Sequence, residues 1–408
     1  MMNMSIKIFK LDIFKMLLLS ILFLFCLNFM NKGTYLYFIL VLAFIVWMYA
    51  KRIKISITNE FFLLLLCFIS YFLIYNIHFS IGLQMFITHC LGPILGYFIG
   101  YHIINKKSNI CINNISVVIV SGLFIHGMLN MFLFFSNGIT SRSVPDIWLG
   151  TPIAATLQGI FFTCVCSLLF YSIYIIKSKK NKVIVLLSIL FSIYSSLRTA
   201  SRTLLVITIV TFICNVIIYM YINKIRFNKI FKLIISVFLI ISTIIVIYKF
   251  NIFNLKDFYE GSEFYNRINS DYITTLSEDP RYEMYKKTII GIYDNPIGGD
   301  RIDGVRYAHN LWLDVGKKVG IIPFTLLILY TVMTLITMIK IIRNNNIEIK
   351  FKYLFASIYI SMILNFMVEP ILEGFPYIFT IMCIFNGATR YYLDSKKRSH
   401  NNESTMVM

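Results

Sequence analysis

Residues 60–77 of this 408-residue chain read EFFLLLLCFISYFLIYNI, and Glu60 is their only charged residue. At the α-helical rise of 1.5 Å per residue, this run spans about 27 Å, close to the thickness of a bilayer's hydrocarbon core. The strands of a membrane β-barrel are instead about 10 residues long and alternate in character. The run therefore predicts a helix that crosses a membrane.

The rest of the chain repeats this pattern. Hydrophobic residues make up 58% of the sequence and charged residues 14%, and the mean hydropathy is +0.76. These values lie outside the range of soluble domains. The sequence thus predicts an all-α, polytopic membrane protein with one domain over residues 1–408. We expect about twelve spans, near residues 13–30, 35–50, 60–77, 81–104, 115–136, 151–176, 183–197, 203–222, 230–250, 319–342, 353–368 and 374–391. The first run has no small-residue cleavage site, so we expect an uncleaved span.

The net charge of +19 is concentrated in alternate connections between these spans. Such connections hold 24 of the 38 lysines and arginines but 5 of the 19 acidic residues, so they carry the whole net charge. Cytoplasmic loops of membrane proteins carry this excess of basic residues. The distribution therefore predicts cytoplasmic N- and C-termini, and it does not imply a nucleic-acid partner.

One long polar segment, residues 251–318, is predicted to lie outside the cytoplasm between the ninth and tenth spans. Long loops of this kind usually serve a function, so we expect it to form a catalytic loop. Within it, Asp279-Pro280 predicts the start of a helix and Asn295-Pro296, followed by two glycines, its end. Four apolar residues recur at helical spacing and predict a stripe facing the bundle or the membrane surface: Tyr282, Tyr285, Ile289 and Ile292.

The sequence RTASR places Arg198 and Arg202 at the tip of a predicted helical hairpin on the outer side. The apolar run before it, residues 183–197, is about 22 Å long as a helix. We therefore expect the tip at or below the lipid headgroups, where arginine is costly unless it is paired. The two arginines either anchor the helix ends or clamp a lipid-borne phosphate through the bidentate guanidinium group.

Other polar residues of the outer side are further candidates. His309 is the only histidine of the long loop, and it is either solvated or catalytic. Three arginines of the same loop could bind an anionic substrate or pair with neighbouring aspartates: Arg281, Arg301 and Arg306. Arg142 is a further candidate for binding the pyrophosphate or the glycan, with a solvated side chain as the alternative. Glu369 and Glu373, near helix ends, are expected to be solvated, with contact to the acceptor as the alternative. The histidines form no HxxH or HExxH pair, so we predict no metal site.

Taken together, these motifs resemble those of the bacterial O-antigen polymerase and O-antigen ligase group of membrane proteins. The matching stretches are TASRTLL at 199–205, PRYEMYKKTIIGIYDNPIGG at 280–299 and AHNLWLDVGKKVGIIPF at 308–324. The resemblance covers roughly residues 190–340. It implies transfer of an oligosaccharide from undecaprenyl pyrophosphate on the outer face of the bacterial cytoplasmic membrane, without a metal or nucleotide cofactor.

By position, the essential arginines of that family fall on Arg202 and Arg281, and its loop histidine falls on His309. Arg198 is an additional arginine beside the first of these. When an acceptor hydroxyl attacks the anomeric carbon, charge develops on the departing pyrophosphate, and fixed arginines would stabilise it. His309 would act as general base or would orient the acceptor.

We therefore expect a polymerase that joins lipid-linked repeat units of O-antigen, capsule or exopolysaccharide by inverting transfer. A ligase that moves glycan to a lipid or protein acceptor fits the same motifs. An oligosaccharide flippase is the alternative from another class, although transporters usually have polar or broken helices at the membrane midplane. The expected partners are the lipid-linked oligosaccharide and membrane lipid, with a chain-length regulator as an open alternative.

Overall fold

The computed structural model describes residues 2–104, 110–138, 142–224, 280–302 and 304–406, with the isolated positions 249, 260 and 265. The predicted span 230–250 and most of residues 251–279 therefore lie outside the described residues. Within the described ranges, nine helical segments are long and apolar enough to cross a membrane. The chain is thus a predominantly helical, multi-pass membrane protein.

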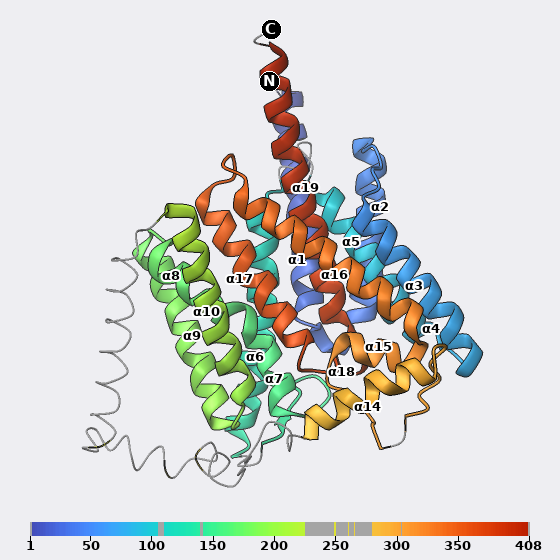
Figure 1. Ribbon diagram of the computed structural model, residues 1–408. Helices are drawn as coiled ribbons and strands as arrows, with labels where there is room; N and C mark the ends of the chain where they lie inside the picture. The colour runs from blue at the N-terminus through green and yellow to red at the C-terminus, as the bar shows by residue number, and fades with distance from the viewer. Residues whose placement is uncertain are drawn as a thin grey trace.

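The helices stand side by side in one bundle (Figure 1). The longer helices are α1 (Met2–Cys26), α2 (Gly33–Lys51), α3 (Asn59–His78), α5 (Gly92–Ile103), α6 (Ile112–Ser136), α7 (Ala155–Cys166), α9 (Lys179–Arg198), α10 (Arg202–Asn223), α14 (Pro280–Asp294), α15 (Leu311–Val319), α16 (Ile321–Arg343), α17 (Ile349–Phe366) and α19 (Pro376–Met406). The short elements are η1 (Phe29–Asn31), α4 (Leu83–Met85), the π-helical η2 (Phe86–Leu91), α8 (Leu169–Tyr174), α18 (Ile371–Gly374) and the paired strands β1 (Val144–Pro145) and β2 (Pro152–Ile153).

Nine of the predicted spans correspond to the nine candidate membrane helices. The predicted spans 13–30 and 374–391 fall on α1 and α19, which are not among the nine, although Phe14–Cys26 is a shorter apolar segment. The expected span 183–197 is too short, because α9 covers 20 residues from Lys179 to Arg198. A helix of that length rises about 30 Å. The helix is thus longer than the apolar run because its first turn contains lysines, and the depth of the RTASR tip stays a prediction.

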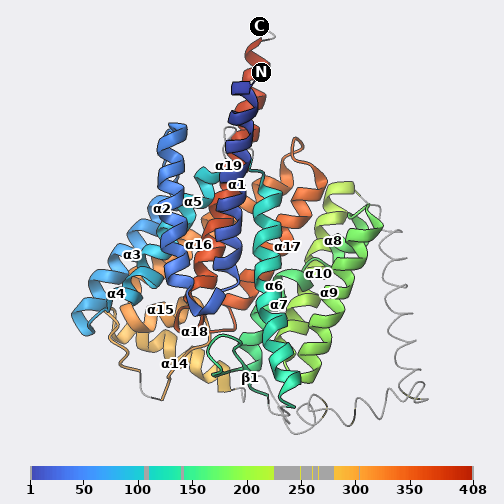
Figure 2. The ribbon, with the colours of Figure 1, turned by 180° about the vertical axis from the view of Figure 1, so that it is seen from behind.

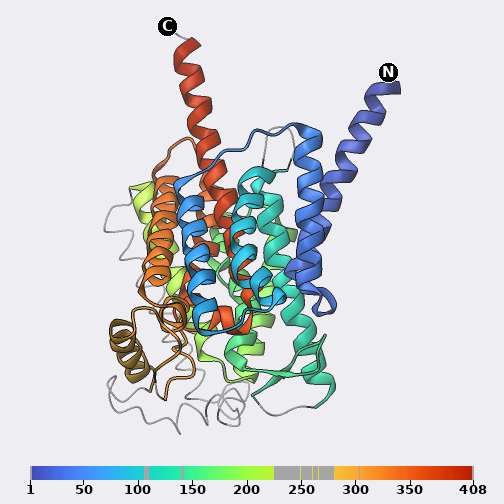
Figure 3. The ribbon, with the colours of Figure 1, turned by 90° about the vertical axis from the view of Figure 1, so that its right-hand side faces the viewer.

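The two ends of the bundle differ in what they carry. The N-terminus and the C-terminus project from the same end, and α14, α15 and α18 lie at the other end (Figures 1 and 2). The α1–α2 turn also lies at the end away from the termini (Figure 3). The α2–α3, α8–α9 and α16–α17 connections, which are rich in lysine and arginine, lie at the end with the termini. We call these the basic end and the loop end.

Helices α5 and α19 approach each other closely through glycine. A Cβ atom added at Gly100 would lie 1.9 Å from the Ile384 carbonyl oxygen, and one added at Gly387 would lie 2.1 Å from the Tyr97 carbonyl oxygen. Small residues of this kind let helix backbones pack directly in membranes. The contact fixes the position of α19 and thereby of the α18–α19 segment at the loop end.

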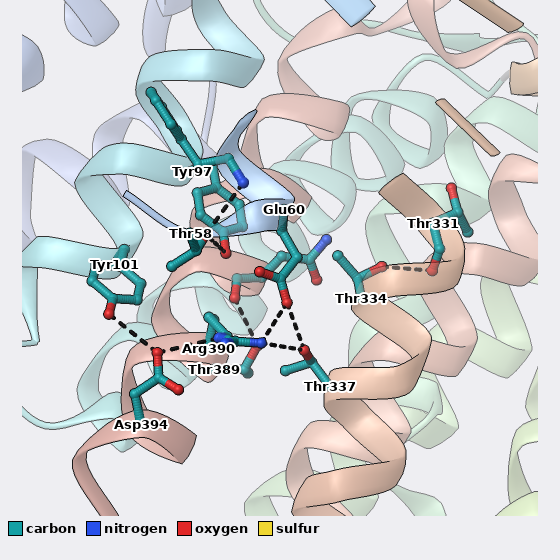
Figure 4. A network of polar contacts seen from close by, with 12 residues as sticks. Thr58, Glu60, Tyr97, Tyr101, Thr331, Thr334, Thr337, Thr389, Arg390 and Asp394 are labelled. Carbon is teal, nitrogen blue, oxygen red and sulfur yellow. Dashed lines mark hydrogen bonds and ion pairs between the residues drawn. The ribbon is translucent and has the colours of Figure 1, made fainter. Parts of the chain in front are cut away.

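A buried polar network near the basic end joins α3, α16 and α19 (Figure 4). The Glu60 carboxylate is paired with the Arg390 guanidinium at 2.7 Å and accepts a hydrogen bond from the Thr337 hydroxyl at 2.9 Å. Arg390 also reaches Asp394 at 3.2 Å. An ionisable residue within a membrane bundle is costly unless it is paired in this way, and the network specifies how these three helices face one another.

The Asn295-Pro296 turn attaches α14 to the rest of the loop end. The helix begins at Pro280 and ends at Asp294, as the sequence predicts. Gly298 and Gly299 have φ angles of +76° and +96°, a region that glycine adopts without steric cost. The Gly299 amide donates to the Lys318 carbonyl at 3.0 Å, and the Ile321 amide donates to the Pro296 carbonyl at 2.9 Å. The turn thus sets α14 against α15 and α16.

The inward face of α14 differs from the predicted stripe. Tyr285 and Ile292 are buried or partly buried, but Tyr282 and Ile289 are 57% and 58% exposed. The inward residues are Arg281, Tyr285, Thr288 and Ile292, which follow helical spacing. The helix therefore directs Arg281 toward the protein and leaves a second apolar face outside.

Candidate functional site at the loop end

His309 lies in a backbone segment that is fixed by the start of α15. Its φ angle is +53°, an uncommon conformation for a residue other than glycine that is often found at functional sites. The Asn310 side chain caps α15 by accepting from the Leu313 amide at 3.2 Å. Asp314 accepts from the Ala308 amide at 2.7 Å and from the Asn310 amide at 3.2 Å. Burial raises the pKa of Asp314 to about 6. Hydrogen bonds on both sides of His309 therefore hold it in place.

Helix α14 and the α17–α18 connection close around this histidine. The Tyr285 hydroxyl donates to the Met367 carbonyl at 3.0 Å and lies 3.5 Å from the His309 carbonyl oxygen. The Asn310 side-chain amide donates to the same Met367 carbonyl at 3.2 Å. Three segments that are distant in the sequence therefore meet at one backbone carbonyl.

Glu369, two residues beyond Met367, is buried at this meeting point. Glu369 is 1% exposed, so the expectation that it is solvated is wrong. One carboxylate oxygen, Oε2, accepts from the Thr156 hydroxyl on α7 at 3.2 Å. The other oxygen, Oε1, has no hydrogen-bond partner among the described residues. A buried carboxylate oxygen without a hydrogen-bond partner is unfavourable.

The charge of Arg281 acts on both His309 and Glu369. Burial, followed by the Arg281 charge, lowers the pKa of His309 below its ordinary value. Burial raises the pKa of Glu369 to about 7, against the opposing effects of Arg281 and the Thr156 hydroxyl. His309 Nδ1 is also buried without a partner among the described residues. We call Arg281, His309 and Glu369 the loop-end cluster. It offers a neutral imidazole as a proton acceptor near pH 7, beside a fixed positive charge.

The RTASR hairpin approaches this cluster through α7. Arg202 is the first residue of α10 and is partly buried, whereas Arg198, the last residue of α9, is exposed. Thr156 of α7 donates to Glu369, and three residues further on a Cβ atom at Gly159 would lie 3.5 Å from the Ser201 hydroxyl oxygen. Thr156, which contacts Glu369, and Gly159, which faces Ser201 just before Arg202, are therefore about one helical turn apart on α7.

The remaining predicted arginines lie outside this cluster. Arg142, Arg301 and Arg306 are exposed. The Arg306 guanidinium lies over the Tyr307 ring at 5.3 Å. Asp300, a neighbouring aspartate that the sequence offered as an arginine partner, pairs with Lys317 at 2.6 Å.

Two lysines of α15 are functional candidates that the sequence did not indicate. Lys317 is 5% exposed, donates to the Arg306 carbonyl at 2.7 Å and lines a cavity of about 180 Å³. Lys318 pairs with Glu373, and both line the same cavity. In the sequence they look like a solvated helix end, because the burial of Lys317 depends on contacts with Asp300 and Arg306 that no local pattern indicates.

Within the described ranges, no three His, Cys, Asp or Glu side chains are grouped as a metal site would require. No family model matches this chain, and no curated protein sequence matches it. The fold and the cluster therefore define a multi-pass helical membrane protein with a buried histidine, arginine and glutamate at one end of the bundle.

Proposed function

We propose that this protein is a membrane glycosyltransferase that polymerises lipid-linked oligosaccharide repeat units on the outer face of the bacterial cytoplasmic membrane. The observation that best supports this proposal is that Arg281, His309 and Glu369 lie close enough at the loop end for the Arg281 charge to act on the other two. The basic end corresponds to the cytoplasm by the positive-inside rule. This assignment gives cytoplasmic termini and exposes the cluster to the outer side, where undecaprenyl-pyrophosphate-linked sugars are used.

The reaction assigned to the cluster is an inverting glycosyl transfer. The acceptor hydroxyl attacks the anomeric carbon, and the bond between that carbon and the pyrophosphate oxygen breaks. The pyrophosphate leaves with the electron pair, and His309 accepts the hydroxyl proton. The guanidinium groups of Arg281 and Arg202 stabilise the charge that develops on the pyrophosphate. Burial and, after it, the Arg281 charge lower the pKa of His309, so both favour the unprotonated base.

A ligase would use the same cluster, and only the product separates the two reactions. A polymerase extends the lipid-linked chain, whereas a ligase transfers the glycan to another lipid or protein. A flippase would move the lipid-linked unit without forming a bond, and substitutions at His309 that preserve folding would then leave glycan length unchanged.

The proposal is tested in cells by separating lipid-linked glycans after His309→Ala. We expect single repeat units instead of long chains, with the protein present at its normal level in the membrane. Tyr293→Ala is the matched control, because Tyr293 lies in the same loop-end region and is 82% exposed. Long chains in the His309→Ala strain would contradict the proposal, and a glycan of unchanged length that no longer reaches a second acceptor would identify a ligase.

A further inference from the structure

A cavity of about 500 Å³ at the loop end is lined by none of the three residues of the loop-end cluster. It lies between the α1–α2 turn, the α4–η2 segment, the loop that joins β1 to β2, and the α18–α19 segment. Its volume is in the range of roughly 300–1,000 Å³ that is typical of small-molecule sites. The cavity is therefore large enough for a ligand of one or more sugar rings.

One wall of this cavity is aromatic. The rings of Phe25 and Tyr37 are 5.2 Å apart, and those of Phe25 and Tyr377 are 6.3 Å apart. All three residues line the cavity. Large apolar faces with a few polar groups are usual in ligand sites, and such faces suit the C–H face of a sugar ring.

The polar groups of the cavity are mostly amides and hydroxyls. Asn31, Gln84 and Thr34 line it, and together they offer both donors and acceptors. A sugar hydroxyl also donates and accepts, so these groups match it. Thr88 and His89 belong to η2, whose π-helical turn is a feature often associated with functional sites.

The charged residues that line the cavity disfavour a phosphate. Asp146 and Glu373 are among the described residues that line it, and no lysine or arginine is. Glu373 is paired with Lys318, so Asp146 is the carboxylate that would repel an anion at short range. The smaller cavity differs in having basic residues, Arg306, Lys317 and Lys318, but Asp300, Asp314 and Glu373 also line it. The larger cavity therefore suits the neutral end of a lipid-linked oligosaccharide rather than its pyrophosphate end.

The Tyr377 hydroxyl, which belongs to the cavity lining, lies beside a buried histidine. The Tyr377 hydroxyl lies 3.4 Å from His126 Nδ1, and His126 Nε2 lies 3.4 Å from an Asp146 carboxylate oxygen. His126 is fully buried. This chain of polar groups restricts the Tyr377 side chain, so a ligand that binds to it meets an ordered group.

We infer that this cavity binds the terminal sugar of the acceptor saccharide, the sugar that supplies the attacking hydroxyl. The inference rests on the proposed function. Glu373 lines both cavities and is paired with Lys318, so the acceptor site adjoins the loop that carries Tyr307 and His309.

The test measures binding without turnover. The probe is the mixture of short oligosaccharides that mild acid releases from the polyprenyl-linked lipids of the source cells. Saturation-transfer NMR with the full-length protein in nanodiscs should give sugar signals for the wild type and for His309→Ala. Absence of sugar signals from the wild type would overturn the inference, and loss of those signals on addition of undecaprenyl phosphate would assign the cavity to the lipid.

Matched variants locate the binding site. Thr34→Trp fills the cavity and should abolish the sugar signals, whereas Tyr35→Trp, at an adjacent residue that is 66% exposed, should retain them. Gln84→Ala removes one amide at an exposed position, so its folding is secure, and it should raise the KM for acceptor at least tenfold. Its control is Leu83→Ala, at a residue that is 76% exposed.

The outcomes separate this inference from the proposed function. Wild-type signals in Thr34→Trp together with an unchanged KM in Gln84→Ala would overturn the acceptor site while leaving polymerisation intact. If the wild type gives sugar signals that Thr34→Trp abolishes, but forms no polymer, the saccharide site is supported and the polymerase is contradicted.

Discussion

At the level of residues, the loop-end cluster shifts the pKa values of a glutamate and a histidine in opposite directions. A glutamate normally loses its proton well below a histidine. Here burial raises the pKa of Glu369 to about 7, and burial with the Arg281 charge lowers that of His309. Both shifts favour the neutral form of the side chain. Pairs of groups with separated and shifted pKa values are typical of sites that transfer protons.

Glu369 should make stability depend on pH. The pKa of Glu369 is raised from 4.5 to about 7 in the folded protein, so its favourable contribution is complete below pH 4.5 and is lost as the pH rises through 7. At about 1.4 kcal/mol per pKa unit, the buried carboxylate costs roughly 3 kcal/mol at pH 8. Glu369→Gln should therefore raise Tm in detergent at pH 8 and change it little at pH 4.5.

Glu373→Gln is the control for this measurement. Glu373 is paired with Lys318, so its amide should give no such gain in Tm at pH 8. A Glu369→Gln protein that melts below the wild type at pH 8 would contradict the assignment of a strained, buried carboxylate.

Sequence motifs identified Arg281 and His309, but they could not identify Glu369 as buried. Arg281 follows a helix-starting Asp-Pro pair, and His309 immediately precedes the residue that caps α15. The burial of Glu369 instead depends on Thr156, which is 213 positions away in the sequence. A charged residue beside a proline at a helix end gives no local sign of such a contact.

At the level of elements, α9 shows why the hydropathy pattern misplaces helix ends. The predicted span starts at Val183, because three lysines interrupt the apolar run before it. The helix nevertheless begins at Lys179, since lysine side chains can extend their charged ends toward water while the backbone stays helical. The predicted stripe on α14 was wrong for a related reason, because spacing alone did not reveal that Arg281 faces inward.

The contact between α5 and α19 should be intolerant of a single methyl group. Gly100→Ala would place a Cβ atom 1.9 Å from the Ile384 carbonyl oxygen, so one helix must move. Overpacking of this kind costs about 1–3 kcal/mol or more. We expect a fall of several degrees in Tm, measured on the protein purified in detergent.

Gly82→Ala is the matched control for this contact. Its added Cβ atom would have no neighbour within 4 Å, and its φ of −71° is ordinary for alanine. Equal Tm values for the two variants would show that α5 and α19 are not packed as described.

At the level of the whole molecule, the bundle separates a basic end from the loop end. The positive-inside rule then predicts which end faces the cytoplasm. Cys111, at the start of α6 near the basic end, is exposed. An impermeant maleimide should therefore label Cys111 only after the membrane is opened. In a Cys111→Ala background, Tyr293→Cys on α14 should be labelled in intact cells, and the reverse pattern would contradict the orientation.

Much of the overall fold could be predicted from the sequence, because runs such as residues 60–77 carry enough apolar length to specify a membrane helix alone. The spacing of charges also separated the two ends. The packing that forms the cluster could not be predicted, since it depends on α14, α15 and the α17–α18 connection meeting at Met367. The large cavity likewise combines four segments of the chain, and none of them has a distinctive motif.

The most direct measurement is an extension assay with the purified protein and a short undecaprenyl-pyrophosphate-linked oligosaccharide, with the lipid-linked products separated on a gel. The account predicts a ladder of whole repeat units from the wild type, and unextended substrate from Arg281→Ala and His309→Ala proteins that remain folded. An unextended substrate with the wild type, or a full ladder with both variants, would contradict the central claim that the loop-end cluster joins lipid-linked sugars.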